Sequence, residues 1–184
     1  SDEVVVIHIS NFRPVKRIDD TLASFAIAAK DRKMRLLLVG DGPEMGQTRR
    51  RAKELGIYDK VIFAGKQEHV AQLLAISDIH VLLSEKEAFG LVVLEAMAIG
   101  VPSVVSTAGG LPEVIQDGVT GYIVPTYDVK MAAARIGELA DDPMLRERMR
   151  EEGIRDTRRR FDSNEIVRRY EQVYERVCAR YELA

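Results

Sequence analysis

Two glutamates eight residues apart flank the start of a helix expected at about Gly90–Ile99. Glu87 lies in the preceding loop Ser84–Gly90, and Glu95 falls in the second turn, so both can face one elongated ligand. Gly90 permits close backbone approach, and the free N–H groups of a first helical turn bind anions. Taken alone, the two carboxylates favour a structural interpretation, with Glu87 an exposed loop acid and Glu95 a capping residue. Their separation of about 12 Å along a helix exceeds the roughly 10 Å of carboxyl pairs that hydrolyse glycosidic bonds.

A second loop, Ser10–Arg17, supplies cations after the first expected strand. Lys16, with Arg13 and Arg17 nearby, presents the kind of point charge that suits a phosphate. Lys16 and Arg17 could equally begin a solvated helix. Together with an anion-binding helix start in the same crevice, however, these cations favour a ligand that carries phosphate.

Three further loops contribute weaker signals. Gly40–Pro43 is mainly a tight strand-to-helix turn, and Gly65–Gln67 could form the edge of a pocket for a base. Gly109–Glu113 opens another helix, which we expect next to the proposed site.

Several motifs of other enzyme classes are missing from the sequence. It holds no Asp-x-Asp motif, and the three histidines, His8, His69 and His80, lack the spacing of metal ligands. No metal site is therefore expected, and His8 is expected to be a packed core residue. The sequence also has no phosphate-binding loop of the NTPases and no strand-linked Gly-x-Gly-x-x-Gly, which argues against nucleoside triphosphatases and dinucleotide enzymes.

Short apolar runs alternate with helical segments along most of the chain. The runs are apolar on both faces, which is typical of parallel strands covered by helices. Strands are expected at Val4–Ile9, Arg35–Val39, Val61–Ala64, Ile79–Leu83, Ser103–Ser106 and Tyr122–Val124. Helices are expected at about Arg17–Lys30, Pro43–Leu55, Val70–Ile76, Gly90–Ile99, Leu111–Gln116, Val129–Ala140, Met144–Arg155 and Ser163–Tyr181.

This alternation predicts an α/β fold, a doubly wound, Rossmann-like parallel sheet of about six strands with a C-terminal helical tail. If the strand order is 3-2-1-4-5-6, the ligand crevice lies between the first and fourth strands, at their carboxyl ends. The loops Ser10–Arg17 and Ser84–Gly90 follow those two strands, so both are expected at this crevice.

Composition narrows the class further. The 184 residues suffice for one domain, and the net charge of −2 argues against an extended nucleic-acid interface. No apolar run is long enough to span a membrane, and the basic runs Arg49–Lys53 and Arg158–Arg160 are interpreted as solvated helix faces. The single cysteine, Cys178, is expected to be a small core residue and fits a reducing, cytoplasmic location. The start at Ser1, close to a buried strand, is expected of a fragment cut at a domain boundary.

Six segments together carry a family resemblance. They are the first-strand loop ending in Lys16, V-G-D-G-P at Val39–Pro43, S-D-I-H-V-L-L-S at Ser77–Ser84, E-A-F-G-L-V-V-L-E-A-M-A at Glu87–Ala98, G-V-P-S-V at Gly100–Val104 and G-G-L-P-E-V-I-Q-D-G-V-T-G-Y at Gly109–Tyr122. This set resembles the C-terminal, donor-binding domain of retaining glycosyltransferases of family 4, which have the GT-B fold. The resemblance covers nearly the whole chain.

The resemblance implies roles for individual residues. Glu87 would contact the donor sugar and Glu95 the ribose hydroxyls, while Lys16 would neutralise the diphosphate; Glu87 and Lys16 are the catalytic candidates. Backbone groups of Phe89, Gly90 and Leu91 would bind phosphate and sugar. Many family members carry an arginine where this chain has Asn11, and Arg13 is a possible substitute. The other donor-binding candidates are Gly40, Lys66 and Gln67.

The resemblance also implies a UDP-sugar donor, UDP-N-acetylglucosamine being the best choice, and a small acceptor such as L-malate. Transfer would need no metal or other cofactor and would retain configuration. Residues 1–184 would form a single donor domain, without the family's N-terminal acceptor domain, so the chain alone should bind UDP weakly and transfer nothing. Full-length homo-oligomers are possible.

Two alternatives remain open from the sequence. One is a fragment of another GT-B-like enzyme, such as a nucleotide-sugar epimerase or a phosphorylase, although neither extra acid/base residues nor a lysine for pyridoxal phosphate stands out. The other is a non-catalytic, receiver-like regulatory module. Such a module would carry acids at the end of the first strand, where this chain has Asn11, Arg13 and Lys16.

Overall fold

A six-stranded parallel sheet forms the centre of the protein. The computed structural model describes residues 3–181. The strands are β1 (Val4–Ile9), β2 (Met34–Val39), β3 (Val61–Gly65), β4 (Ile79–Leu82), β5 (Ser103–Ser106) and β6 (Gly121–Val124). Their order is β3-β2-β1-β4-β5-β6, which confirms the predicted arrangement and places β1 beside β4 at the point where the order reverses.

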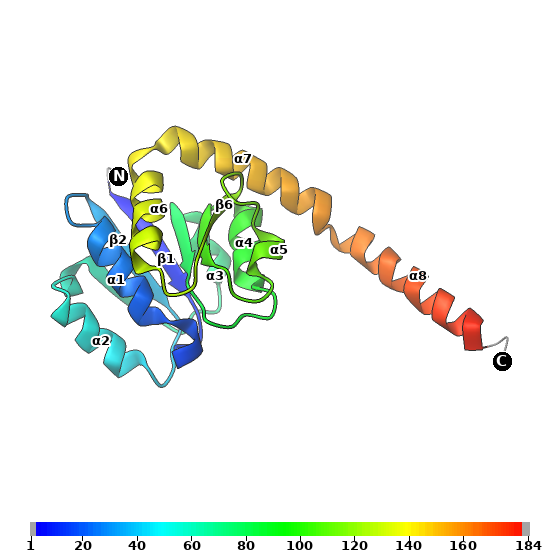
Figure 1. Cartoon of the computed structure of the whole chain (residues 1–184), viewed down its shortest axis with the longest axis horizontal. Coiled ribbons are helices and arrows are strands. Elements are labelled where there is room, and N and C mark those ends of the chain that lie inside the picture. Colours follow the sequence, from blue (N-terminus) through cyan, green and yellow to red (C-terminus); the bar gives the residue numbers. More distant parts are fainter. Residues whose placement is uncertain (1–2, 182–184) are drawn as a thin grey trace.

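Helices cover both faces of the sheet (Figure 1). On one face, α1 (Ile18–Ala28), α2 (Met45–Glu54) and α6 (Val129–Asp141) pack on a core that includes Phe25, Leu36 and Ile136. On the other face lie α3 (Val70–Ala75), α4 (Leu91–Ile99) and α5 (Leu111–Val114). The strands inside the sheet are buried from both sides, which explains their continuous apolar runs, whereas Ile62 of the edge strand β3 is exposed.

Two long helices complete the chain. The helix α7 (Pro143–Arg160) begins at Asp142, whose carboxylate accepts from the Leu145 amide, and it packs along α4 where Gly153 lies against Met97. The helix α8 (Ser163–Tyr181) then projects away from the rest of the protein (Figure 1). No helix within residues 3–181 combines the length and apolar character needed to cross a bilayer.

One sequence prediction about the helices is wrong, and two short turns were not predicted. Cys178 is exposed, because α8 projects from the domain and no core forms around it. The expected helix beginning at Arg17 is preceded by a short 3-10 turn at Pro14–Lys16, and a second such turn occupies Tyr58–Lys60; neither was expected.

Two buried histidines lie on the adjacent central strands β1 and β4. Ile7, the residue before His8, pairs with His80, so the two rings face opposite sides of the sheet. His8 and His80 are both fully buried. Burial lowers the pKa of His8 to about 4 and that of His80 to about 3. Both rings are therefore neutral at pH 7, and protonation would place charge in the core.

We predict that these histidines make the fold sensitive to mild acid. Below pH ~6.5 His8 and His80 bind protons in the unfolded chain but stay neutral in the folded protein. The free energy of unfolding therefore falls as pH falls toward 4. Between pH 6.5 and 5 the loss is at most about 2 kcal/mol per histidine. Urea unfolding at both pH values should show a smaller loss for His80→Gln than for wild type. The exposed His69→Gln variant should keep the wild-type loss, and an undiminished loss in His80→Gln would contradict the assignment.

Candidate functional site

The loops that follow β1 and β4 meet at the carboxyl edge of the sheet. Lys16 Nζ lies 2.6 Å from Glu87 Oε2, and the two side chains are 19% and 16% exposed. The Glu85 backbone amide also donates a hydrogen bond of 2.8 Å to the Val15 carbonyl, which joins the two loops. The ammonium and the carboxylate, which are 71 residues apart in sequence, therefore form one partly buried site.

Local backbone geometry places Lys16. Pro14 starts the 3-10 turn, and Lys16 ends it next to Arg17, which has the left-handed backbone angle φ of 50°. The Arg17 side chain turns elsewhere: it pairs with Asp20 at 2.9 Å and lies 5.0 Å from the centre of the Tyr127 ring. Arg17 is thus not a cation of the Glu87 site, whereas Lys16 is.

The start of α4 offers free backbone donors beside this pair. Gly90 precedes the helix with φ of 85°. Within residues 3–181, the amide groups of Phe89, Gly90 and Leu91 have no hydrogen-bond acceptor. These donors and the positive end of the helix dipole favour an anion at this position.

The loop after β5 fixes the position of the Glu87 loop. The Gly110 amide donates to the Glu87 carbonyl at 3.2 Å. A Cβ added at Gly109 would lie 1.7 Å from that same carbonyl oxygen, so no larger residue fits there without displacing the backbone. The structure therefore confirms that Gly109–Glu113 opens a helix next to the site, and it shows why glycines stand there.

Behind the Lys16 loop, His8 packs as expected. Its Nδ1 lies 3.0 Å from the Val81 carbonyl and its Nε2 lies 2.8 Å from Ser10 Oγ. Because a carbonyl only accepts, Nδ1 carries the proton and the Ser10 hydroxyl donates to Nε2. The neutral ring thus supports the end of β1.

Other candidate residues lie on the loops after β1, β2 and β3, and among the described residues none of their side chains has a hydrogen bond or ion pair with the side chain of Lys16 or Glu87. Asn11 and Arg13 are exposed on the Lys16 loop. The Gly40 amide donates to the Gly65 carbonyl at 2.8 Å, which joins the loops after β2 and β3. Lys66 and Gln67 follow on the surface, and the side-chain Nε2 of Gln67 donates to the Ala64 carbonyl at 2.6 Å.

Glu95 is exposed on α4 and lines a hollow of about 590 Å³ between α3 and α4. Glu68 and His69 lie in the same lining, and neither is among the site residues expected from the sequence. They directly follow Lys66 and Gln67, which is the only signal that could have indicated them.

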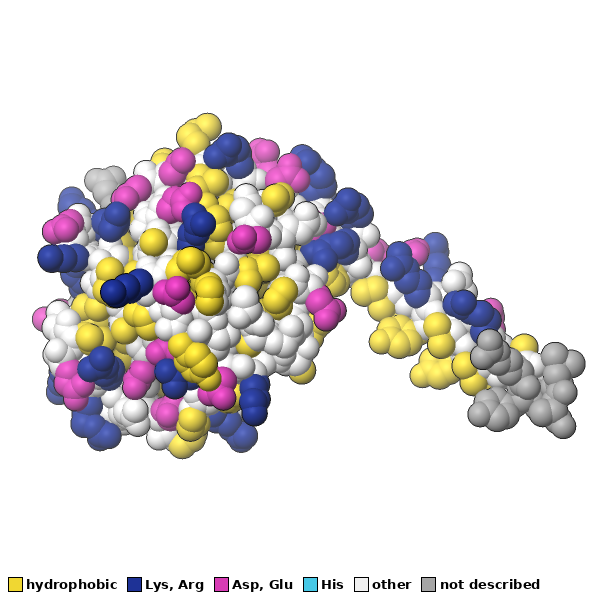
Figure 2. Space-filling model, in the orientation of Figure 1, with side chains coloured by type: hydrophobic (Ala, Val, Ile, Leu, Met, Phe, Trp, Pro, Cys, Tyr) yellow, Lys and Arg dark blue, Asp and Glu magenta, His cyan; other side chains and the backbone are white. Residues whose placement is uncertain are grey.

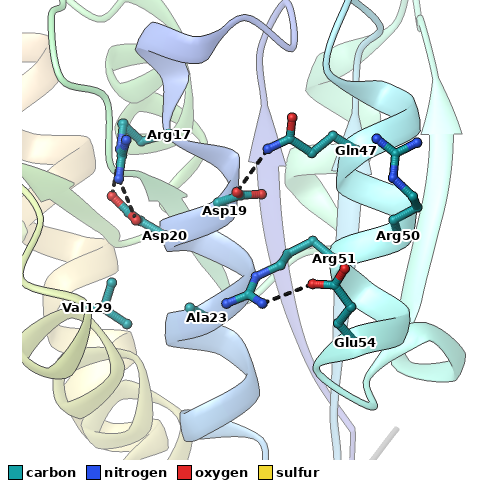
Figure 3. Close-up of a pocket in the computed structure, with 9 residues that line it drawn as sticks. All are labelled: Arg17, Asp19, Asp20, Ala23, Gln47, Arg50, Arg51, Glu54 and Val129. Carbon is teal, nitrogen blue, oxygen red and sulfur yellow. Dashed lines mark hydrogen bonds and ion pairs between the residues drawn. The ribbon is translucent and has the colours of Figure 1, made fainter.

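A second hollow, of about 510 Å³, lies between α1 and α2 (Figure 3). Its charged lining is largely paired internally: Arg17 with Asp20, Gln47 with Asp19, and Arg51 with Glu54. It therefore presents little unsatisfied charge to a ligand. No group of three or more metal-ligating side chains occurs among the described residues.

Comparisons with known proteins identify the family of the chain. Residues 1–156 match the family model described as glycosyl transferases group 1. N-acetyl-alpha-D-glucosaminyl L-malate synthase of Bacillus anthracis is 48% identical over 172 residues, or 94% of this chain and 45% of that protein. The chain thus spans less than half the length of this relative.

Solved structures show the same fold. HepE of Anabaena, in complex with UDP and glucose, has a TM-score of 0.84 at 27% identity, covering 97% of this chain and 49% of that one. The C-terminal domain of a group 1 glycosyl transferase (LpcC) from Francisella tularensis has a TM-score of 0.81 at 22% identity, covering 87% of each chain, and supports the fold alone. The resemblance inferred from the sequence motifs is confirmed, and the chain belongs to the glycosyl transferases group 1 family.

Proposed function

We propose that this chain is the donor-binding domain of a retaining glycosyltransferase and that it binds a UDP-sugar at the carboxyl ends of β1 and β4. The observation that carries the proposal is the 2.6 Å contact of Lys16 with Glu87 beside the unbonded amides of Phe89, Gly90 and Leu91. The similarity to HepE, which was crystallised with UDP and glucose, supports it.

In the proposed complex the diphosphate lies between the Lys16 ammonium and the first turn of α4. A cation and free N–H groups there supply charge-assisted hydrogen bonds to phosphate oxygens. Glu87 accepts from sugar hydroxyls, and Glu95 accepts from the ribose at the hollow between α3 and α4. Lys66 and Gln67 border the base, and Arg13 provides the second cation in place of an arginine at Asn11.

We propose UDP-N-acetylglucosamine as the donor and L-malate, or a similar small hydroxy acid, as the acceptor. The 48% identity to the malate synthase of Bacillus anthracis supports both choices. The acceptor hydroxyl oxygen forms a bond to the anomeric carbon on the face from which UDP departs, and the leaving phosphate takes the hydroxyl proton. A metal ion is not used, in keeping with a sequence that lacks an Asp-x-Asp motif.

The acceptor would bind to a second domain outside this chain, and α8 is the element we propose to dock on it. Along one side of α8 the residues Val167, Tyr170, Val173, Tyr174 and Val177 are all exposed. Figure 2 shows apolar side chains gathered along one side of the projecting helix. Exposed apolar surface of this kind marks a protein interface. We place the full protein in the cytoplasm, and without its acceptor domain the chain should bind donor without transferring sugar.

Lys16 is expected to contribute strongly to the affinity for UDP. Replacing Lys16 with Gln removes a charge-assisted hydrogen bond to phosphate and should weaken UDP binding about 10- to 100-fold. Isothermal titration of the purified chain with UDP measures this. Lys33→Gln is the matched control, because Lys33 is exposed and precedes β2 at the opposite edge of the sheet. Equal UDP affinities of the two variants would contradict the proposed site.

Glu87 is expected to contribute to binding of the sugar and not of the diphosphate. In the ligand-free protein Glu87 forms an ion pair with Lys16. The Glu87→Gln variant removes this pair, so the ammonium is free to bind phosphate and the UDP affinity should be unchanged or higher. The same variant should lose the additional affinity that the sugar contributes, so UDP-N-acetylglucosamine should bind no better than UDP. Titrations with both ligands test this. A loss of UDP affinity as large as that for UDP-N-acetylglucosamine would assign Glu87 a structural role instead.

A further inference from the structure

The C-terminal end of α7 contacts α5, the helix that lies next to the Glu87–Gly90 loop. Arg160, the last residue of α7, donates to the Glu113 carbonyl at 2.7 Å and to the Val114 carbonyl at 2.6 Å. These carbonyls belong to the end of α5, where a helix leaves acceptors unsatisfied. One guanidinium therefore caps α5 from 46 or 47 residues away in sequence.

A buried carboxylate holds that guanidinium in place. Asp156 is 5% exposed, and its Oδ2 accepts from Arg160 Nε at 2.8 Å and also contacts Arg160 Nη2. Burial alone would raise the pKa of Asp156, but hydrogen bonds from Arg160 and Arg159 outweigh burial and lower it. Asp156 is thus an anion that orients Arg160 toward α5. The neighbouring Arg159 binds the other carboxylate oxygen at 2.8 Å and has no bond to α5 among the described residues.

The next residue reaches the donor loop directly. The ring of Phe161 lies 5.9 Å from that of Phe89 in an edge-to-face arrangement, and the Arg160 guanidinium lies 4.6 Å from the centre of the Phe161 ring. Phe89 is one of the residues whose backbone amide has no acceptor within residues 3–181.

From α5 the contacts continue to Glu87. The Gly110 amide just before α5 donates to the Glu87 carbonyl, and a Cβ added at Gly90 would lie 2.5 Å from Leu111 Cδ2. A shift of α5 therefore moves the backbone of the Glu87–Gly90 loop. The loop is held on one side by α5 and on another by Phe161.

We propose that Asp156, Arg160 and Phe161 form a brace that positions the Glu87–Gly90 loop for donor binding. Asp156 and Arg160 are positioning residues, since they act through α5. This inference rests on the proposed function for the role of the loop, while the brace itself is a property of the ligand-free chain. The two can therefore fail separately.

The matched pair Arg160→Gln and Arg159→Gln tests the brace. Both remove a guanidinium from Asp156, but only Arg160 reaches α5. In ligand-free protein, Arg160→Gln should speed hydrogen exchange at the Gly110 amide, which donates to Glu87, whereas Arg159→Gln should leave it at the wild-type rate. Arg160→Gln should also weaken UDP binding about 3- to 30-fold, and Arg159→Gln should change it less than about twofold.

A purely structural role would lower the melting temperature of Arg160→Gln without changing UDP affinity or Gly110 exchange in the native protein, and that result overturns the proposal. If Arg160→Gln does not fold, Phe161→Leu decides, because it keeps the Arg160 bonds and removes the ring contact with Phe89. It should weaken UDP binding, and wild-type affinity overturns the brace. If wild-type chain binds no UDP, the proposed function fails, and Gly110 exchange alone decides whether the brace exists.

Discussion

The contact between Lys16 and Glu87 joins the β3-β2-β1 half of the sheet to the β4-β5-β6 half. It lies where the strand order reverses, between β1 and β4. It links the loop after β1 to the loop after β4, at a separation of 2.6 Å and with both side chains mostly buried. A partly buried charge without a partner would be costly, and here each group is the other's partner. A ligand with phosphates and hydroxyls can satisfy both at once. The ligand-free site therefore already holds the charges that the proposed donor needs.

Backbone contacts hold the pair in register with α4. The strand order brings the loops after β1 and β4 together. The close approach of Gly109 to the Glu87 carbonyl then limits where the Glu87 loop can lie. The helix α7 packs along α4 and ends at Arg160, which caps α5. The Glu87–Gly90 loop is thus supported by a helix that contributes no residue to the proposed donor site.

The sheet and its order follow from the sequence because strands buried on both faces leave an unmistakable apolar pattern. The meeting of the Lys16 loop and the Glu87 loop was expected from the strand order, since loops at the carboxyl ends of adjacent strands lie together. The ion pair between Lys16 and Glu87 was not predicted. Arg160 was misjudged as part of a solvated run: its spacing to Asp156 is visible in the sequence, but its partners on α5 are not. Cys178 was misjudged because a periodic apolar face indicates burial without indicating the partner.

An amide-resolved magnetic resonance titration of the chain with UDP tests the central claim most directly. The nucleotide should perturb the amides of Phe89, Gly90 and Leu91 most strongly, together with those around Lys16, because the diphosphate is placed between them. Perturbations confined to the hollow between α1 and α2, or elsewhere away from these residues, would contradict the assignment of the donor site.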